Sequence, residues 1–154
     1  MYGVSKLTSE PNMMLITFPG AQYTARSMAD YLEAFAQNEV VLDMICQSAP
    51  RGTEIDFSFT ASSTYFATVM KTIPRLAAEK GGPGPLISGG YVKVNLFGEE
   101  MVSSCGVAAR ALAALAQENI EVALITTSDL DISLLLREEH EDTALTSLAR
   151  AFAL

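Results

Sequence analysis

Apolar and polar side chains alternate along Met13–Gly20 and again along Tyr91–Gly98, which is the pattern of a β-strand with one buried face. Two further β-rich runs follow each of these segments. They are Val40–Gln47 and Glu54–Thr60 in the first half of the chain, and Ile120–Thr127 and Leu130–Arg137 in the second half. The pattern therefore predicts three strands in each half.

After the first strand of each half, apolar residues recur at the three- and four-residue spacing of a helix. These positions are Met28, Tyr31, Leu32, Phe35 and Ala36 in the first half, and Ala108, Ala111, Leu112, Leu115 and Ala116 in the second. A second helix is predicted after the third strand. Its apolar positions are Phe66, Val69, Met70 and Ile73 in the first half, and Leu145, Leu148, Ala149 and Phe152 in the second. Pro74 is expected to end or kink the first of these because it lacks an N–H group.

The two halves are copies of one supersecondary unit. Met28–Ser48 aligns with Ala108–Ser128 at an offset of 80, and the strands before and after align at offsets of 78 and 75. The offsets change where loops are expected, and loops tolerate insertions. Each copy has the order β-α-β-β-α, which a fourth strand would complete as a ferredoxin-like βαββαβ unit.

The fourth strand of the first copy can come from Pro85–Ser88. The glycine-rich segments Gly81–Gly84 and Gly89–Gly90 are interpreted as a turn-rich hinge or linker between the copies. The second copy reaches Leu154 directly after its last helix, so we expect the spare segment Tyr2–Thr8 to cross over and complete its sheet; a frayed tail is the alternative. The prediction is an α+β fold of two interleaved units, with antiparallel sheets and helices on one face. Residues 10–90 form the first unit, and residues 91–154 form the second, completed by a strand from residues 1–9.

Composition narrows the function. The net charge is −8, with ten Lys and Arg against eighteen Asp and Glu, which disfavours nucleic acid and anionic membranes as partners. No apolar stretch approaches the roughly 20 residues of a membrane helix, and no targeting segment is apparent. Cys46 and Cys105 are expected to be reduced thiols. We therefore expect a cytoplasmic protein.

Candidate catalytic chemistry is sparse. Cys105 precedes a predicted helix, but the single histidine, His140, lies in the acidic run Glu138–Asp142 at the opposite end of the predicted unit. One histidine and scattered carboxylates do not supply a metal site, and the glycines match no phosphate-binding motif. No catalytic residue, metal or cofactor is predicted.

A binding site is predicted where the loop Gly98–Gly106 enters a helix. The free N–H groups of the first helical turn and the hydroxyls of Ser103 and Ser104 suit a ligand carboxylate. In the adjacent corner Thr126–Asp129, the Asp129 carboxylate suits an ammonium group. The alternative is that these serines and threonines cap the helix and tighten turns.

These residues also carry a resemblance. Val92–Leu136 resembles the second ACT-type stretch in the C-terminal regulatory region of aspartokinases, with a Gly-x-x-Met loop, a Gly-Val-Ala-Ala helix start and an Ile-x-Thr-Ser-Asp corner. Val41–Ser48 and Glu54–Thr60 resemble the first ACT-type stretch. Tyr2–Ser5 resembles the segment that follows the kinase domain, which in that family is shared with the second ACT unit.

The resemblance implies binding of lysine or threonine, and a homodimer or a complex with a kinase-bearing subunit. The implied effector contacts are Met101, Ser103, Ser104, Gly106, Val107, Thr127, Ser128 and Asp129. Two departures are present: Tyr23–Arg26 stands where the family has Asp-Lys-Pro-Gly, and Cys105 replaces a proline. The kinase domain is absent, so no phosphotransfer is expected from this chain on its own.

Three functions compete at this point. The first is an allosteric amino-acid sensor of an aspartate kinase, and the second is a ligand-silent ACT-type dimerisation or interaction module. A small free-standing enzyme is the third.

Overall fold

The structure is a computed structural model and describes residues 2–154. The chain divides into two compact units. The first unit is Asn12–Gly89, and the second unit combines residues 2–11 with Gly90–Leu154. Each unit holds its own hydrophobic core.

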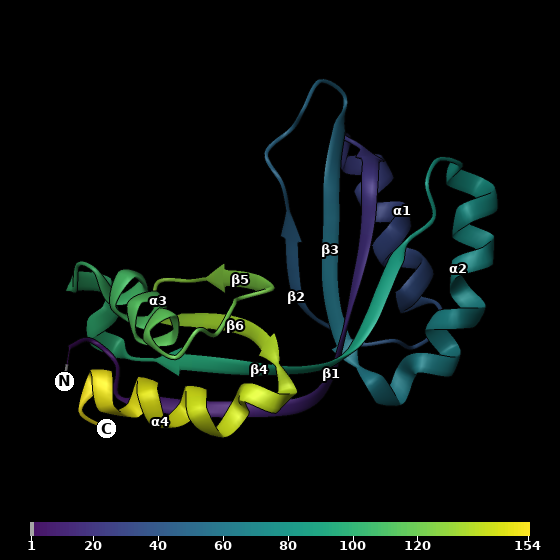
Figure 1. Ribbon diagram of the computed structural model, residues 1–154. Coiled ribbons are helices and arrows are strands. Elements are labelled where there is room, and N and C mark those ends of the chain that lie inside the picture. Colours follow the sequence, from purple (N-terminus) through teal and green to yellow (C-terminus); the bar gives the residue numbers. More distant parts are fainter. Residues whose placement is uncertain (1) are drawn as a thin grey trace. The chain divides into compact units, whose positions relative to one another are not determined.

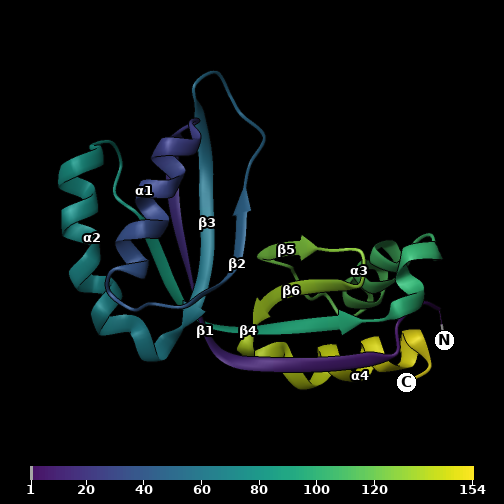
Figure 2. The same cartoon turned by 180° about the vertical axis from the view of Figure 1, so that it is seen from behind.

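The first unit places two helices on one face of four strands (Figures 1 and 2). Its elements are the second part of β1 (Lys6–Gln22), α1 (Ala25–Ala36), β2 (Leu42–Gln47), β3 (Glu54–Ser62), the 3-10 turn η1 (Ser63–Tyr65), α2 (Phe66–Lys80) and the start of β4 (Leu86–Phe97). The strand order is β2-β3-β1-β4, and β3 pairs antiparallel with both β1 and β2.

The second unit repeats this arrangement with different segments. Its elements are the start of β1, the rest of β4, η2 (Glu99–Ser103), α3 (Val107–Gln117), β5 (Leu124–Thr127), β6 (Asp131–Arg137), η3 (Glu138–His140) and α4 (Glu141–Phe152). The strand order is β1-β4-β6-β5, and β6 pairs antiparallel with β4 and β5. Helices α3 and α4 are joined by a hydrogen bond from Ser147 Oγ to the carbonyl of Ala114, at 3.0 Å.

Strands β1 and β4 each serve both units, and this continuity is what interleaves them. The segments Tyr2–Thr8 and Met13–Gly20 were expected to be separate strands, as were Pro85–Ser88 and Tyr91–Gly98. They form two long strands instead. The predicted α+β fold of two interleaved ferredoxin-like units is confirmed.

The repeat is visible in which helical residues are buried. In α1 these are Ser27, Tyr31, Ala34 and Phe35, and in α3 they are Val107, Ala111, Ala114 and Leu115, the same positions at an offset of 80. The predicted stripe was therefore wrong in part, because Leu112 and Ala116 are exposed. The two helices turn the same face to their sheets, so the two copies share packing geometry as well as sequence.

Pro74 was expected to end or kink helix α2; the helix does not end there but continues to Lys80. Buried residues on both sides of the proline, Val69, Thr72 and Leu76, keep the two halves of the helix on the sheet. Core packing therefore outweighs the loss of one backbone hydrogen bond. The segment Gly81–Gly84 joins α2 to β4 inside the first unit, so it is not a linker between the units.

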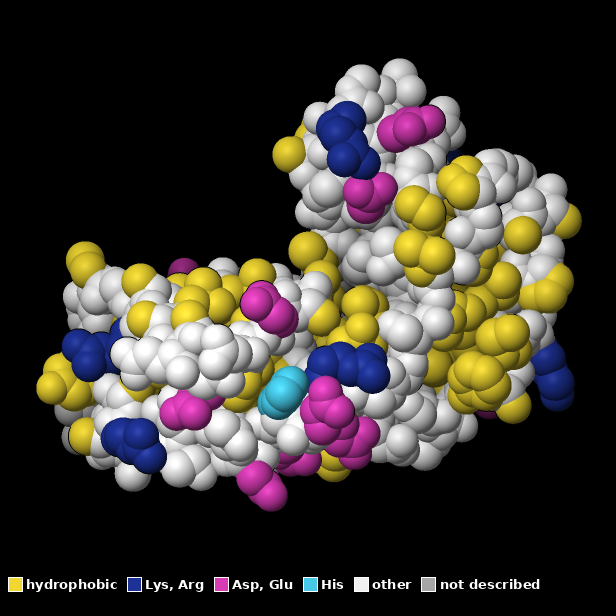
Figure 3. Space-filling view, in the orientation of Figure 1, with side chains coloured by type: hydrophobic (Ala, Val, Ile, Leu, Met, Phe, Trp, Pro, Cys, Tyr) yellow, Lys and Arg dark blue, Asp and Glu magenta, His cyan; other side chains and the backbone are white. Residues whose placement is uncertain are grey.

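The outer face of α2 is unexpectedly apolar. Phe66 and Met70, which were predicted to face the core, are 54% and 45% exposed. Figure 3 shows apolar side chains gathered over the part of the first unit that contains this helix. No helix in the described part of the chain is both long enough and apolar enough to cross a membrane.

Candidate functional site

The loop between β4 and α3 is a short 3-10 turn held by its own serines. Ser104 Oγ donates a hydrogen bond to the carbonyl of Glu100 at 2.8 Å, and Ser103 Oγ donates to the same carbonyl at 3.2 Å. The backbone N–H of Met101 donates to the carbonyl of Gly98 at 3.1 Å. The serine hydroxyls thus stabilise the loop, and their oxygens retain the capacity to accept hydrogen bonds.

Helix α3 begins without a side-chain cap. Its N-cap residue is Gly106, at a left-handed φ of 82°, and no side chain accepts a hydrogen bond from the first turn. Helix α1 in the first unit differs, because the hydroxyl of Thr24 accepts a hydrogen bond from the N–H of Ser27 at 3.1 Å. Unsatisfied N–H groups at a helix start favour negative charge. The start of α3 can therefore receive an anion, whereas that of α1 is partly closed.

The β5–β6 corner lies beside this helix start. Ser128 Oγ accepts hydrogen bonds from the N–H groups of Leu130 and Asp131, at 3.2 and 3.1 Å, which fixes the turn. A backbone bond from the N–H of Gly98 to the carbonyl of Leu130, at 2.9 Å, ties the corner to the loop. Thr127 and Asp129 remain exposed.

The loop and the corner enclose a hollow of about 360 Å³. Its lining comprises Met101, Val102, Ser104, Gly106, Val107, Ala108, Thr127, Ser128, Asp129 and Ile132. Seven of the eight residues expected at the site are in this set; Ser103 is the one that is not. Asp129 is the one charged side chain among the described residues of the lining.

The remaining lining residues, Val102, Ala108 and Ile132, were not anticipated. Val102 and Ala108 adjoin anticipated residues in the sequence, and Ile132 follows Asp129 by three positions. Their apolar character alone indicates ordinary packing. They give the hollow an apolar side, which suits a small organic ligand with charged groups at one end.

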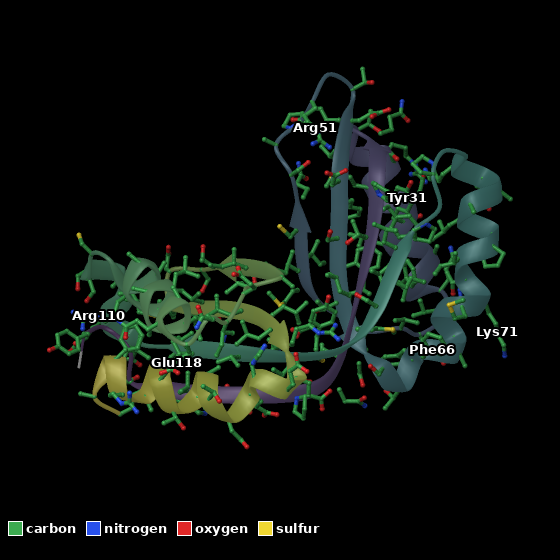
Figure 4. The ribbon with its side chains drawn as sticks, viewed as in Figure 1. Tyr31, Arg51, Phe66, Lys71, Arg110 and Glu118 are labelled. Atoms are coloured by element: carbon green, nitrogen blue, oxygen red, sulfur yellow. The ribbon has the colours of Figure 1, made fainter. Side chains whose placement is uncertain are left out.

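The N-terminal segment passes close to the hollow. The N–H of Ser5 donates to the carbonyl of Phe97 at 2.8 Å, and a Cβ built on Gly3 would lie 2.9 Å from the side chain of Ser104. Tyr2 is covered by the guanidinium of Arg110, 3.8 Å from the ring centroid; Figure 4 labels this arginine on α3. Only a residue without a side chain fits at Gly3, a requirement that the sequence alone does not reveal.

Other candidate groups lie apart from one another. Cys105 is exposed at the start of α3, while His140 lies ahead of α4 with its Nε2 3.6 Å from a carboxylate oxygen of Glu139. In the loop of the first unit, Arg26 pairs with Asp30 at 2.8 Å on its own helix. Across residues 2–154, no group of three or more His, Cys, Asp or Glu side chains is arranged to hold a metal ion.

Comparisons with known proteins agree with this architecture. Residues 94–152 match the family model of the ACT domain. The aspartate kinase Ask_LysC of Stutzerimonas stutzeri (strain A1501) is 30% identical over 139 residues, which cover 90% of this chain and 34% of that protein. The aspartokinase of Geobacillus stearothermophilus is 26% identical over 151 residues, 98% of this chain and 36% of that protein.

Solved structures extend the likeness to the whole chain. The structure of aspartokinase alpha and beta subunits aligns with a TM-score of 0.89 and 28% identity, covering 98% of this chain and 99% of that one. The regulatory subunit of aspartate kinase from Thermus thermophilus, at 23% identity, shares the fold with a TM-score of 0.89 over 97% of this chain and 99% of that one.

The fold and these matches define a tandem ACT-domain protein. The chain belongs to the family of aspartate kinase regulatory regions, and it spans about a third of the length of the curated aspartate kinases it matches.

Proposed function

We propose that this chain is an allosteric module of an aspartate kinase that binds lysine or threonine in the hollow of the second unit. The observation that carries the proposal is the convergence of two loops on one hollow, with the uncapped start of α3 and the Asp129 carboxylate both in its lining. An amino acid has the matching pair of charges.

In this proposal, the carboxylate and the ammonium of the effector each have a partner in the hollow. The effector carboxylate would accept hydrogen bonds from the N–H groups of the first turn of α3, which begins at Val107. Its ammonium would pair with Asp129, and its side chain would lie against Met101 and Ile132. Lysine would bring a second ammonium into a hollow with one carboxylate, so we expect threonine to bind more tightly.

The first unit contributes no equivalent site to this proposal. Its corresponding loop, Tyr23–Arg26, supplies the cap of α1 through Thr24, and Arg26 is engaged with Asp30. The family has an acid and a glycine in this loop, and this chain lacks both. The start of α1 is therefore not open in the way that the start of α3 is. We therefore expect one effector site of this type in each chain.

Regulation requires a second protein component. The matched structure with alpha and beta subunits supports assembly with a kinase-bearing subunit, and a homodimer through the ACT units is the other expected arrangement. An effector that binds two arrangements of these units with different affinity would shift their populations, and the kinase would respond in the cytoplasm.

Isothermal titration calorimetry of the purified full chain against threonine, lysine and methionine tests the function. Saturable binding of threonine or lysine is the expected result. A stable protein that gives no heat with any of the three would favour a ligand-silent ACT-type dimerisation module.

A further inference from the structure

The first unit contains a second hollow, built from elements that the proposed function does not use. It has a volume of about 330 Å³ and lies at the start of α1, the end of α2 and the adjoining ends of β1 and β3. Its side-chain lining includes Phe18, Ser27, Tyr31, Glu54, Leu76 and Lys80. None of Tyr23–Arg26 lines it, so it is distinct from the loop that corresponds to the effector loop of the second unit.

Ser27 is the unusual residue of this hollow. It is 3% exposed, and its Oγ has no hydrogen-bond partner, the one such buried side-chain nitrogen or oxygen among the described residues. The N–H of Ser27 is already bonded to Thr24, so the helix cap does not account for the hydroxyl. A buried hydroxyl without a partner destabilises the fold, and Ser27 is one of the residues that line the hollow.

The side chains of Lys80 and Tyr31 are two further groups that could contact a ligand in this hollow. The ammonium of Lys80 is 2.6 Å from a carboxylate oxygen of Asp30 and 5.4 Å from the centroid of the Tyr31 ring. The Lys80 side chain is 19% exposed and is already paired with Asp30, so a ligand carboxylate would share this ammonium with Asp30. Burial raises the pKa of Tyr31, which keeps its phenol neutral and able to donate a hydrogen bond. Figure 4 labels Tyr31 on α1.

Another part of the lining favours a positively charged group. Glu54 adds a carboxylate from β3, and α2 ends here at Gly81, where the last carbonyls of the helix favour a positive group. Phe18 and Leu76 are buried apolar residues between these polar groups. The hollow therefore combines hydroxyls and an ammonium with a carboxylate and a helix C-terminus.

We propose that this hollow is a second ligand site, for a compact zwitterion such as a small α-amino acid. Ser27, Tyr31 and Lys80 receive the carboxylate of the ligand. Glu54 and the carbonyl end of α2 receive its ammonium. The site does not depend on the effector site of the second unit.

The test is amide-resolved NMR of the full chain carrying Asp129→Ala, which disables the other site. The probes are glycine, alanine and serine, with propionate and ethylamine as single-charge controls. Saturable shifts of the amides of Ser27, Thr53, Gly81 and Gly82 with an amino acid, and weak or absent shifts with the controls, are expected. No saturable shift in this set at millimolar concentration would overturn the proposal, whatever the result at the effector site.

Two substitutions separate binding from folding. Ser27→Ala and Tyr31→Phe should each weaken binding by about threefold to tenfold, the range of one neutral hydrogen bond. Tyr65→Phe is the matched control, because Tyr65 packs on the same core outside the hollow. Ser27→Ala should also unfold at the same or a higher temperature, since it removes a hydroxyl without a partner. Unchanged affinity in Ser27→Ala, or a lower unfolding temperature, would show that the hydroxyl serves the fold and would overturn the assignment.

Discussion

Ser9 Oγ donates a hydrogen bond to the carboxylate of Glu141 at 2.6 Å, although 132 positions separate the two residues. The next residue, Glu10, pairs with Lys93 of β4 at 3.1 Å. The first bond attaches the start of β1 to α4, and the second attaches it to β4, both within the second unit. Val4, ahead of this strand, is fully buried in the core of that unit.

Deletion of residues 2–9 should therefore destabilise the second unit. It removes Val4 from the core and exposes the edge of β4, and we expect a loss of about 3 kcal/mol or more in the free energy of unfolding. Thermal unfolding followed by circular dichroism measures it, with Val4→Ala as a milder version of the same defect. An unchanged unfolding temperature would mean that the segment is a frayed tail.

Gly98→Ala should lower the stability of the second unit because of a steric clash at this position. A Cβ on Gly98 would overlap the carbonyl oxygen of Gly3, so the N-terminal segment must move away. We expect a loss of more than about 2 kcal/mol in stability, as for other overpacked sites. Gly89→Ala, in the strand β4 that ends just before Gly98, is the control, because a Cβ there meets nothing within 4 Å. Equal urea midpoints for the two variants would contradict this account.

The Asp30–Lys80 pair predicts a pH dependence. The hydrogen bond from Lys80 is the largest of the effects that lower the pKa of Asp30 below its ordinary value of 3.8. A carboxyl with a lowered folded-state pKa contributes stability above its ordinary pKa and loses it as the pH falls through the lower value. The stability difference between wild type and Asp30→Asn should thus shrink below about pH 4. Urea unfolding across this range checks it, and a difference that stays constant down to about pH 2 would refute it.

Thr24→Ala should weaken the start of α1 by about 1 kcal/mol, the usual contribution of an N-cap hydroxyl. Chemical denaturation of the full chain measures this loss. Thr53→Ala is a suitable comparison, because the Thr53 side chain is exposed and caps no helix. A loss in Thr24→Ala no larger than that in Thr53→Ala would show that the cap is not needed.

Much of the fold could be predicted because the alternation of apolar and polar residues along a strand shows which of its faces is buried. In the predicted strand Glu54–Thr60, the apolar residues Ile55, Phe57 and Phe59 alternate with polar ones, and all three are buried. The joining of strands was not predicted: Gly89–Gly90 was interpreted as a linker, and Pro11 lies between the two segments that were expected to be separate strands. A proline without an N–H or a glycine without a side chain weakens a strand locally, but pairing with neighbouring strands can carry the backbone through.

One of the two candidate sites could be predicted from the sequence, and the other could not. The hollow of the second unit could be anticipated because its residues come from two short segments, each with a recognisable motif. The hollow of the first unit could not, since Ser27, Glu54 and Lys80 lie far apart in the sequence and carry no shared pattern. What singles out Ser27 is an unpartnered buried hydroxyl, which becomes apparent only in three dimensions.

The position of the effector site is tested most directly by calorimetry of the Asp129→Ala variant with threonine and lysine. Glu118→Gln is the control, because Glu118 is exposed at the far end of α3 (Figure 4). Our account predicts that binding is lost, or weakened on the order of tenfold or more, in Asp129→Ala and retained in Glu118→Gln. Equal affinity in both variants would place the effector away from this hollow and contradict the account.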